Sequence, residues 1–436
     1  MAEANYKPKK IAKLDELHIP DRLIVFLILS VLKDAATNGD HEFGIAEKMK
    51  VPNFVIKPVI QELKEKSKFI DTFTSQITGQ LHYRILEAGD RAHSDMMEKY
   101  RYKSYVVPVA FEDYCKSVEE QANKLNLHVK MEEIEKICKE RALHFSTDFK
   151  RELKSLVTNR RPFLIYGPPG NGKTAITEIL YKLLDYTVYI PHAIYLNGSI
   201  YPYFIDGVHE SLDGTIDKET LKNFDNRWIY VKPPKIIVCT NSSVEYFDMR
   251  GLILPPQVVA NLGIMIIDDF GRNPPRNPNQ KSSIEILNRF ITLFESEADV
   301  LELDNGRARF PVKERIILSS NMKMEDILDQ AFRRRLPFNL GIFNPSEEVA
   351  EKIFTDTAKK LGSTQSDDVL KEMFQYFDGL YKQNKISIPG SDARDMLSFV
   401  KAMQDDPALP LNITKEVLET AFKKRYDVIK ENVNMF

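Results

Sequence analysis

The stretch that decides the fold reads Gly167-Pro168-Pro169-Gly170-Asn171-Gly172-Lys173-Thr174. It fits the pattern G-x-x-x-x-G-K-[ST], in which backbone N–H groups wrap phosphates at the start of a helix. The apolar residues 163–166 before it predict a strand, and apolar residues at helical spacing from Ile176 to Leu184 predict a helix after it. These flanks favour a phosphate-binding loop over a Gly-Pro surface turn. We expect all eight residues to cradle ATP, with Lys173 on the β- and γ-phosphates and the Thr174 hydroxyl on Mg²⁺.

A carboxylate pair follows a second apolar stretch. Residues 264–267 predict a buried strand that ends in Asp268-Asp269. A phosphate-binding loop needs a carboxylate on a neighbouring strand, so we expect Asp268 to hold Mg²⁺ through water and Asp269 to polarise the attacking water. Solvated acids capping a strand would be the simpler interpretation of the pair alone. The preceding loop favours the catalytic one.

Two further strands end in asparagine, at residues 236–241 and 316–321. Here the sequence resembles the AAA+ ATPases, in which a polar sensor residue ends the strand that follows the acid-bearing strand. That order selects Asn321, and leaves Asn241 as a strand-end residue.

The resemblance continues in residues 328–335, which end in three arginines. In AAA+ proteins an arginine of this segment points into the nucleotide site of the neighbouring subunit and stabilises charge on the γ-phosphate. Arg334 and Arg335 align best with that role, and Arg333 aligns less well. A basic helix end interacting with its own dipole is the alternative.

The segment 391–395 resembles the second sensor of the family. Ser391 would be the N-cap of a helix, which places Arg394 in the first turn, facing the cleft and the γ-phosphate. An ordinary surface ion pair of Arg394 is the alternative.

The resemblance covers residues 140–436 and implies an α/β fold, a P-loop core with a parallel sheet and a C-terminal helical lid. The expected boundaries are residues 1–100 for an N-terminal winged-helix domain, 101–140 for a helical linker, 141–345 for the core and 346–436 for the lid. The long stretch between the P-loop helix and Asp268 is similar to the helix-2-insert branch, which includes the MoxR-type ATPases, and to bacterial members with an N-terminal winged helix. Many family members have Asp-Glu where this chain has Asp268-Asp269. The shorter Asp269 side chain puts fast hydrolysis in doubt, although helicase loaders of the family also carry Asp-Asp.

The winged-helix expectation for residues 21–100 rests on the order helix, helix, helix, two short strands, helix. Winged helices bind DNA or proteins. Residues 1–100 contain 15 Lys and Arg against 15 Asp and Glu, so their net charge is zero. This neutrality favours a protein partner over nucleic acid.

Composition sets the remaining limits. The chain has 436 residues, a formal net charge of −2 and a hydrophobic fraction of 43%, which excludes a largely disordered protein. Its three cysteines are too few and too scattered for a disulfide framework, which indicates a reducing compartment. The longest apolar run, residues 23–32, is about half of the ~20 residues needed to cross a bilayer. We therefore expect a cytoplasmic protein without a membrane partner.

The leading hypothesis is an ATP-hydrolysing motor that forms a homo-oligomeric ring, hexameric by resemblance, and remodels a protein partner. The aromatic run Tyr201-Pro202-Tyr203-Phe204 is either a pore loop for that partner or part of a buried core. Two alternatives remain: a DNA-associated loader or regulator, and a nucleotide-dependent scaffold with weak hydrolysis.

Overall fold

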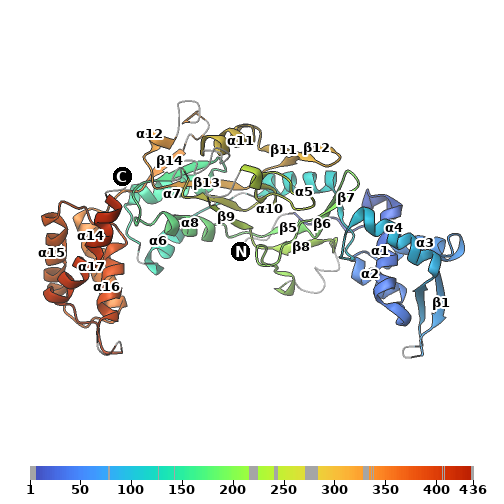
Figure 1. Ribbon diagram of the computed structural model, residues 1–436, viewed down its shortest axis with the longest axis horizontal. Helices are drawn as coiled ribbons and strands as arrows, with labels where there is room; N and C mark the ends of the chain where they lie inside the picture. The colour runs from blue at the N-terminus through green and yellow to red at the C-terminus, as the bar shows by residue number, and fades with distance from the viewer. Residues whose placement is uncertain are drawn as a thin grey trace.

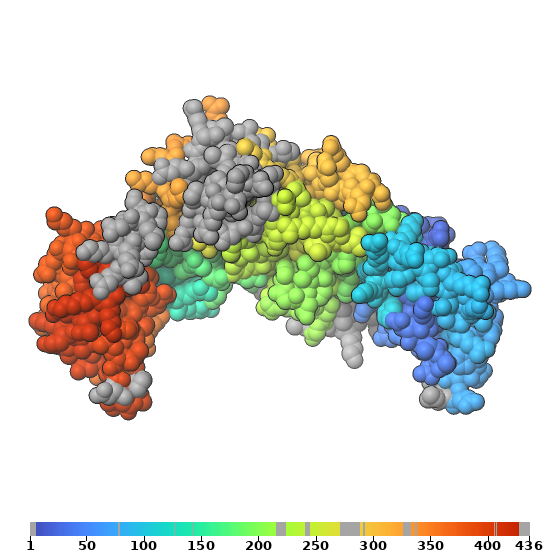
Figure 2. All heavy atoms as spheres, viewed as in Figure 1, coloured from blue at the N-terminus to red at the C-terminus, as the bar shows by residue number. Residues whose placement is uncertain are grey.

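The computed structural model describes residues 6–76, 79–125, 127–141, 143–215, 224–239, 244–270, 283–327, 333–334, 336, 338–404, 406 and 408–433. These residues form three parts arranged in a line (Figure 1). The N-terminal helices lie at one end, a sheet-containing core lies in the middle, and the C-terminal helices lie at the other end. The space-filling view shows the same order (Figure 2).

The N-terminal part has its elements in the order that the sequence predicts. They are α1 (Asp21–Asp34), α2 (Glu42–Met49), α3 (Asn53–Glu65), β1 (Ile70–Thr74), β2 (Leu81–Ile85) and α4 (Glu87–Tyr100). The apolar run of residues 23–32 lies within α1 and is buried against the other helices. The run is therefore a core helix of this part. The assignment to the winged-helix fold stays a prediction.

The core is built on a parallel sheet with the strand order β14-β4-β13-β10-β9. Its strands are β4 (Phe163–Tyr166), β9 (Lys235–Cys239), β10 (Ile264–Asp268), β13 (Arg315–Ser320) and β14 (Phe338–Gly341). All four pairings between neighbours are parallel. The three inner strands are almost entirely buried, as in sheets covered on both faces. The predicted α/β class with a parallel sheet is confirmed.

One β-hairpin of the central part packs its two faces against two different hydrophobic clusters. Its strands are β6 (Ala193–Leu196) and β7 (Ser199–Pro202). Ile194 and Tyr201 pack with the residues around the parallel sheet, whereas Ala193 and Ile200 pack with the N-terminal helices. Because side chains alternate between the faces of a strand, one hairpin joins the two parts.

Two tyrosines of the aromatic run at the end of this hairpin lie in the interior. Tyr201 is 4% exposed and Tyr203 is fully buried, with its hydroxyl donating to the Val258 carbonyl across 2.7 Å. In this structure Tyr201 and Tyr203 belong to the hydrophobic core, which favours the buried interpretation of the run.

The stretch predicted to be a linker, residues 101–140, packs on the core. It contains β3 (Val109–Ala110), α5 (Phe111–Lys124) and α6 (Met131–Glu140). β3 pairs with β6, and the buried Gln121 side chain exchanges two hydrogen bonds with the backbone of Tyr189, across 2.9 and 2.8 Å. The domain boundaries themselves stay predictions.

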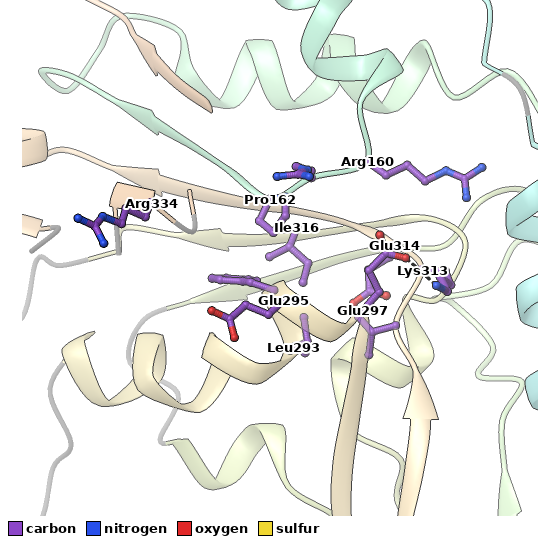
Figure 3. Close-up of a pocket in the computed structure, with 12 residues that line it drawn as sticks. Arg160, Pro162, Leu293, Glu295, Glu297, Lys313, Glu314, Ile316 and Arg334 are labelled. Carbon is purple, nitrogen blue, oxygen red and sulfur yellow. Dashed lines mark hydrogen bonds and ion pairs between the residues drawn. The ribbon is translucent and has the colours of Figure 1, made fainter. Parts of the chain in front are cut away.

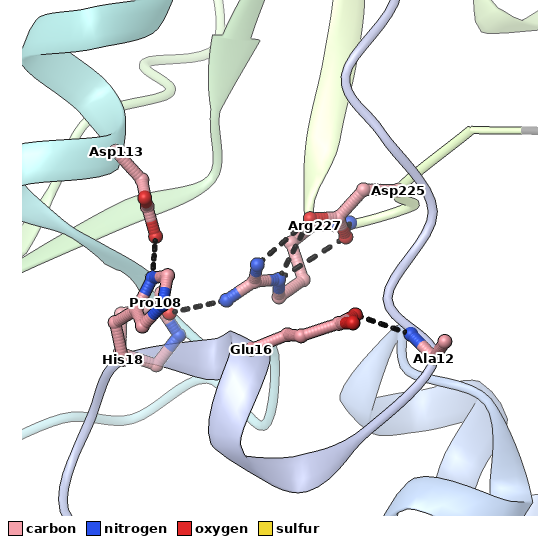
Figure 4. A network of polar contacts seen from close by, with 7 residues as sticks. All are labelled: Ala12, Glu16, His18, Pro108, Asp113, Asp225 and Arg227. Carbon is pink, nitrogen blue, oxygen red and sulfur yellow. Dashed lines mark hydrogen bonds and ion pairs between the residues drawn. The ribbon is translucent and has the colours of Figure 1, made fainter.

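A buried ion pair lies where the segment before α1 meets the core (Figure 4). The Arg227 guanidinium donates to both carboxylate oxygens of Asp225, at 2.8 to 3.1 Å, and to the Pro108 carbonyl at 3.2 Å. Beside it, His18 Nδ1 lies 2.9 Å from Asp113 Oδ2. These contacts therefore join three stretches of sequence, the segment before α1, residues 108–113 and residues 225–227.

The C-terminal part is a helical bundle with its own hydrophobic core. Its helices are α14 (Glu347–Lys360), α15 (Asp367–Gln383), α16 (Asp392–Ala402) and α17 (Lys415–Val433). Within the described part of the chain, no helix combines the length and the apolar character needed to cross a membrane.

Candidate functional site

A cleft of about 870 Å³ opens at the carboxyl ends of β4, β13 and β10. The loop 167–174 follows β4, Asp268 ends β10, and Asn321 follows β13 directly. Because β13 lies between the other two strands, Asn321 lies between the loop and the acid pair. The lining of the cleft includes Lys173, Thr174, Asp268, Asp269, Asn321 and Arg394.

The loop backbone follows a path that requires glycine at its start. Gly167 has φ +141°, and a Cβ there would lie only 1.9 Å from the Ile342 carbonyl oxygen. Gly172 precedes helix α8 (Lys173–Lys182) with φ +88°. The first amides of α8 have no partner within the helix, so its N-terminus is a ready site for a phosphate.

The Lys173 side chain is 8% exposed. Its ammonium donates to the carbonyls of Gly167 and Pro168 across 2.8 and 2.9 Å. Burial lowers the pKa of Lys173 to about 8, and the nearby carboxylates of Asp268 and Asp269 oppose that shift. Charged phosphate oxygens accept stronger hydrogen bonds than these carbonyls. The Lys173 ammonium can therefore exchange its carbonyl partners for phosphate oxygens when a nucleotide binds.

The acid pair has an unusual backbone. Asp269 has φ +53°, a left-handed conformation, and its N–H donates to Asp268 Oδ1 across 3.0 Å. Asn321 Nδ2 donates to Asp269 Oδ1 across 2.6 Å. Such conformations in non-glycine residues cluster at functional sites. The asparagine thus fixes one oxygen of the carboxylate proposed as the base.

The oxygen atoms of this site suit Mg²⁺. The ion usually binds through one or two carboxylates together with nucleotide phosphates and waters, and the cleft offers the Thr174 hydroxyl and the Asp268 carboxylate. Among the described residues, no group of three or more His, Cys, Asp or Glu is arranged to hold a metal.

Arg394 lies in the first turn of α16, with Ser391 at the N-cap. The Ser391 side chain makes no capping hydrogen bond, contrary to the usual use of serine there. The Arg394 side chain is 71% exposed, and its guanidinium lies 3.2 Å from Asp395 Oδ1. Arg394 therefore lines the cleft and also makes the surface ion pair, and its contact with a γ-phosphate stays a prediction.

Arg334 is not among the residues that line the cleft. Arg334 lines a second cavity of about 660 Å³, formed at the opposite, amino ends of β4 and β13. Arg334 lies on one side of this cavity, while Glu297, Lys313 and Glu314 gather on the other (Figure 3). Arg333 is exposed. Arg335 and Asn241 lie outside the described residues.

Sequence reasoning missed the wall formed by residues 143–149. The rings of Phe145 and Phe149 stack with centroids 4.6 Å apart and line the cleft. Next to them, His144 Nε2 lies 2.9 Å from Asp356 Oδ2 of α14. Two aromatic residues four positions apart are the only local signal, and packed helix faces show the same spacing.

Known proteins offer limited comparison. No protein-family model and no curated protein matches the chain. Among solved structures, the FIGL-1 AAA domain in complex with ADP is similar at 14% identity and a TM-score of 0.32, over 61% of this chain and 71% of that one. NtrX from Brucella abortus in complex with ATP is similar at 14% identity and a TM-score of 0.37, over 80% and 70% of the two chains. Both scores are low, so the functional argument rests on the geometry of the cleft.

Proposed function

We propose that this chain is an AAA+ ATPase that binds Mg·ATP in the cleft and hydrolyses its terminal phosphoanhydride bond. One observation carries the proposal: the loop 167–174, the pair Asp268-Asp269 and Asn321 come from distant stretches of sequence and converge on one cleft. The position of β13 between the loop-bearing and acid-bearing strands supports it.

Each residue then has a role that its position allows. Lys173 and the amides at the start of α8 bind and orient the phosphates. Thr174 and Asp268 would hold Mg²⁺, whose charge supplies electrostatic stabilisation of the phosphates. Asp269 accepts a proton from the attacking water, and Asn321 holds that carboxylate in place.

Arg334 acts on a neighbouring subunit in this proposal. Arg334 lines a cavity at the opposite ends of the strands and does not line the cleft. This position is compatible with Arg334 reaching the nucleotide site of another copy of the chain. A head-to-tail contact between two different surfaces forms a ring when the rotation between copies closes, and the resemblance to the family implies a hexamer. Arg335 is the second candidate for this role.

The N-terminal part is the proposed docking module for a protein substrate that the ring remodels. Phe43 on α2 and Phe54 on α3 are 66% and 51% exposed, and residues 1–100 carry no net charge. Exposed aromatic side chains on a neutral surface favour protein over nucleic acid. Gel shifts with duplex DNA across a range of salt test the loader alternative, which requires binding at low salt.

Phosphate release measured over a range of protein concentrations tests the proposed ATPase. Because neighbouring copies complete each site, the rate per chain should rise as the ring assembles. A rate per chain that is constant across dilution would contradict completion in trans.

A scaffold with weak hydrolysis is the second candidate. The 2.6 Å hydrogen bond from Asn321 occupies one oxygen of Asp269, and Asp269 is one methylene shorter than the glutamate that many family members carry. Both features favour slow turnover. Phosphate release by wild type and by Asp269→Asn distinguishes the scaffold from the ATPase.

A further inference from the structure

The C-terminal bundle touches the phosphate-binding loop directly. The Ser391 N–H donates to the Gly170 carbonyl across 2.7 Å, and the Gly390 N–H donates to Asn171 Oδ1 across 2.8 Å. The approach is tight, because a Cβ on Gly170 would lie 2.8 Å from Ser391 Oγ. The segment before α16 is therefore attached to the loop that would wrap the phosphates.

Asn171 uses both ends of its amide group for this attachment. Its Oδ1 accepts from Gly390, and its Nδ2 donates to Asn344 Oδ1 across 2.7 Å. Asn344 lies in the connection between β14 and α14. One side chain, 8% exposed, thus joins the loop to the segment before α16 and to the connection before α14.

The bundle is held rigidly just beyond this attachment. Asp392, the first residue of α16, is 1% exposed and accepts hydrogen bonds from the Tyr381 hydroxyl at 2.7 Å and from Arg425 at 3.0 Å. These partners lie on α15 and α17. The helix that follows residues 390–391 is therefore connected at its first residue to both α15 and α17.

Arg394 depends on the same attachment. It lies four residues after Gly390, about one helical turn along the chain, and lines the cleft. Its side chain is mostly exposed and pairs with its neighbour Asp395 on the same helix. Its reach toward a γ-phosphate is set by where α16 begins.

We propose that Asn171 is a positioning residue that ties the C-terminal bundle to the phosphate-binding loop and thereby sets the position of Arg394 in the cleft. The part concerning Arg394 rests on the proposed ATPase function, whereas the tie itself does not. Nucleotide binding, which engages the amides of the loop, would be transmitted to the bundle through this amide.

Amide hydrogen exchange of peptides covering residues 386–396 tests the tie in the full chain without nucleotide. Asn171→Ala removes the acceptor of the Gly390 N–H, so exchange of this segment should rise about tenfold, the effect of losing one or two hydrogen bonds. Asn344→Ala should raise it less. Asn344→Asp, which keeps an oxygen acceptor, and Asn412→Ala, at an exposed asparagine between α16 and α17, should exchange like wild type.

Steady-state kinetics test the role of Arg394. Asn171→Ala should lower kcat about tenfold with a KM change of less than about threefold, because the loss acts on transition-state contacts more than on binding. In an Arg394→Ala background, Asn171→Ala should lower kcat no further, since both changes remove the same contact. Effects on kcat that multiply would overturn the positioning role.

The two proposals fail separately. Unchanged exchange in Asn171→Ala overturns the tie, whatever the kinetics. Raised exchange with wild-type kcat overturns the positioning role and leaves the ATPase intact. A wild-type chain without turnover overturns the ATPase, and with it the role of Arg394, while exchange still decides the tie.

Discussion

The side-chain amide of Asn321 donates a 2.6 Å hydrogen bond to Asp269 Oδ1, and so links two strands that neighbour each other in the sheet but are distant in sequence. This contact places a polar group between the loop and the carboxylate that would activate water. It also restrains the orientation of the Asp269 carboxylate, and the rate of hydrolysis depends on how that carboxylate faces the attacking water.

Asp269→Asn should retain nucleotide binding and lose phosphate release by about 10²- to 10⁴-fold, the usual contribution of a general base. Asp304→Asn, on an exposed loop, is the matched control and should turn over like wild type. Equal rates for wild type and Asp269→Asn would support the scaffold and contradict Asp269 as the base.

Nucleotide affinity should depend on pH through Lys173. Its pKa is lowered to about 8 by burial, and phosphates bind the ammonium form. The dissociation constant for ADP should therefore rise about tenfold per pH unit above about pH 8, until the pKa of the complex is reached. Titrations from about pH 7 to about pH 9.5 measure this slope.

Lys173→Arg is the control for that slope, because the guanidinium stays charged throughout this range. Equal slopes in the two proteins would assign the pH dependence to another group.

The free energy of unfolding should change with pH in the opposite direction to nucleotide affinity. The folded chain binds the Lys173 proton less tightly than the unfolded chain, whose lysine has a pKa near 10.5. The contribution of Lys173 to the free energy of unfolding therefore increases as the pH rises from about 8 to about 10.5.

Mixing two inactive variants tests the role of Arg334 in trans. Lys173→Ala should bind no nucleotide, and Arg334→Ala should bind it without turnover. In an equimolar mixture, about a quarter of head-to-tail interfaces pair an intact arginine with an intact loop. Phosphate release should then recover to about a quarter of the wild-type rate. Full turnover by Arg334→Ala alone, or a mixture as inactive as its components, would exclude Arg334 as the trans-acting group.

The ion pair of Arg227 and Asp225 should dominate the stability of its region. Their side chains are 2% and 4% exposed, so Arg227→Ala leaves a buried carboxylate without its partner and should lower the free energy of unfolding by about 3–5 kcal/mol. Urea denaturation measures the change. Arg151→Ala breaks a pair with side chains 69% and 89% exposed and should cost less than about 1 kcal/mol. A similar small loss for both variants would show that the buried pair is not the main contribution.

Much of the cleft could be predicted because its chemistry is local in sequence. The loop 167–174 is recognisable from its own residues and flanks, and Asp268 from the apolar strand that it ends. The resemblance to AAA+ ATPases, in which the sensor residue ends the strand after the acid-bearing strand, selected Asn321, which the structure places beside Asp269. The strand pattern also predicted the α/β class.

The long-range contacts could not be predicted in this way. Asn171 and Gly390 are 219 positions apart, and no pattern around either residue encodes their hydrogen bond. The two faces of the β6–β7 hairpin pack against different cores, and nothing in residues 193–202 alone assigns each face to its core. The aromatic run 201–204 left a pore loop open as an alternative to a buried core, because burial depends on the surrounding structure and not on the run itself.

The central claim is that the cleft hydrolyses ATP, and phosphate release by wild type and by Lys173→Ala in Mg·ATP tests it most directly. Wild type should release phosphate at a rate that saturates with ATP concentration, while Lys173→Ala stays at the background of the buffer. Equal release by the two proteins, at any ATP concentration, would contradict the assignment of this cleft as the site of hydrolysis.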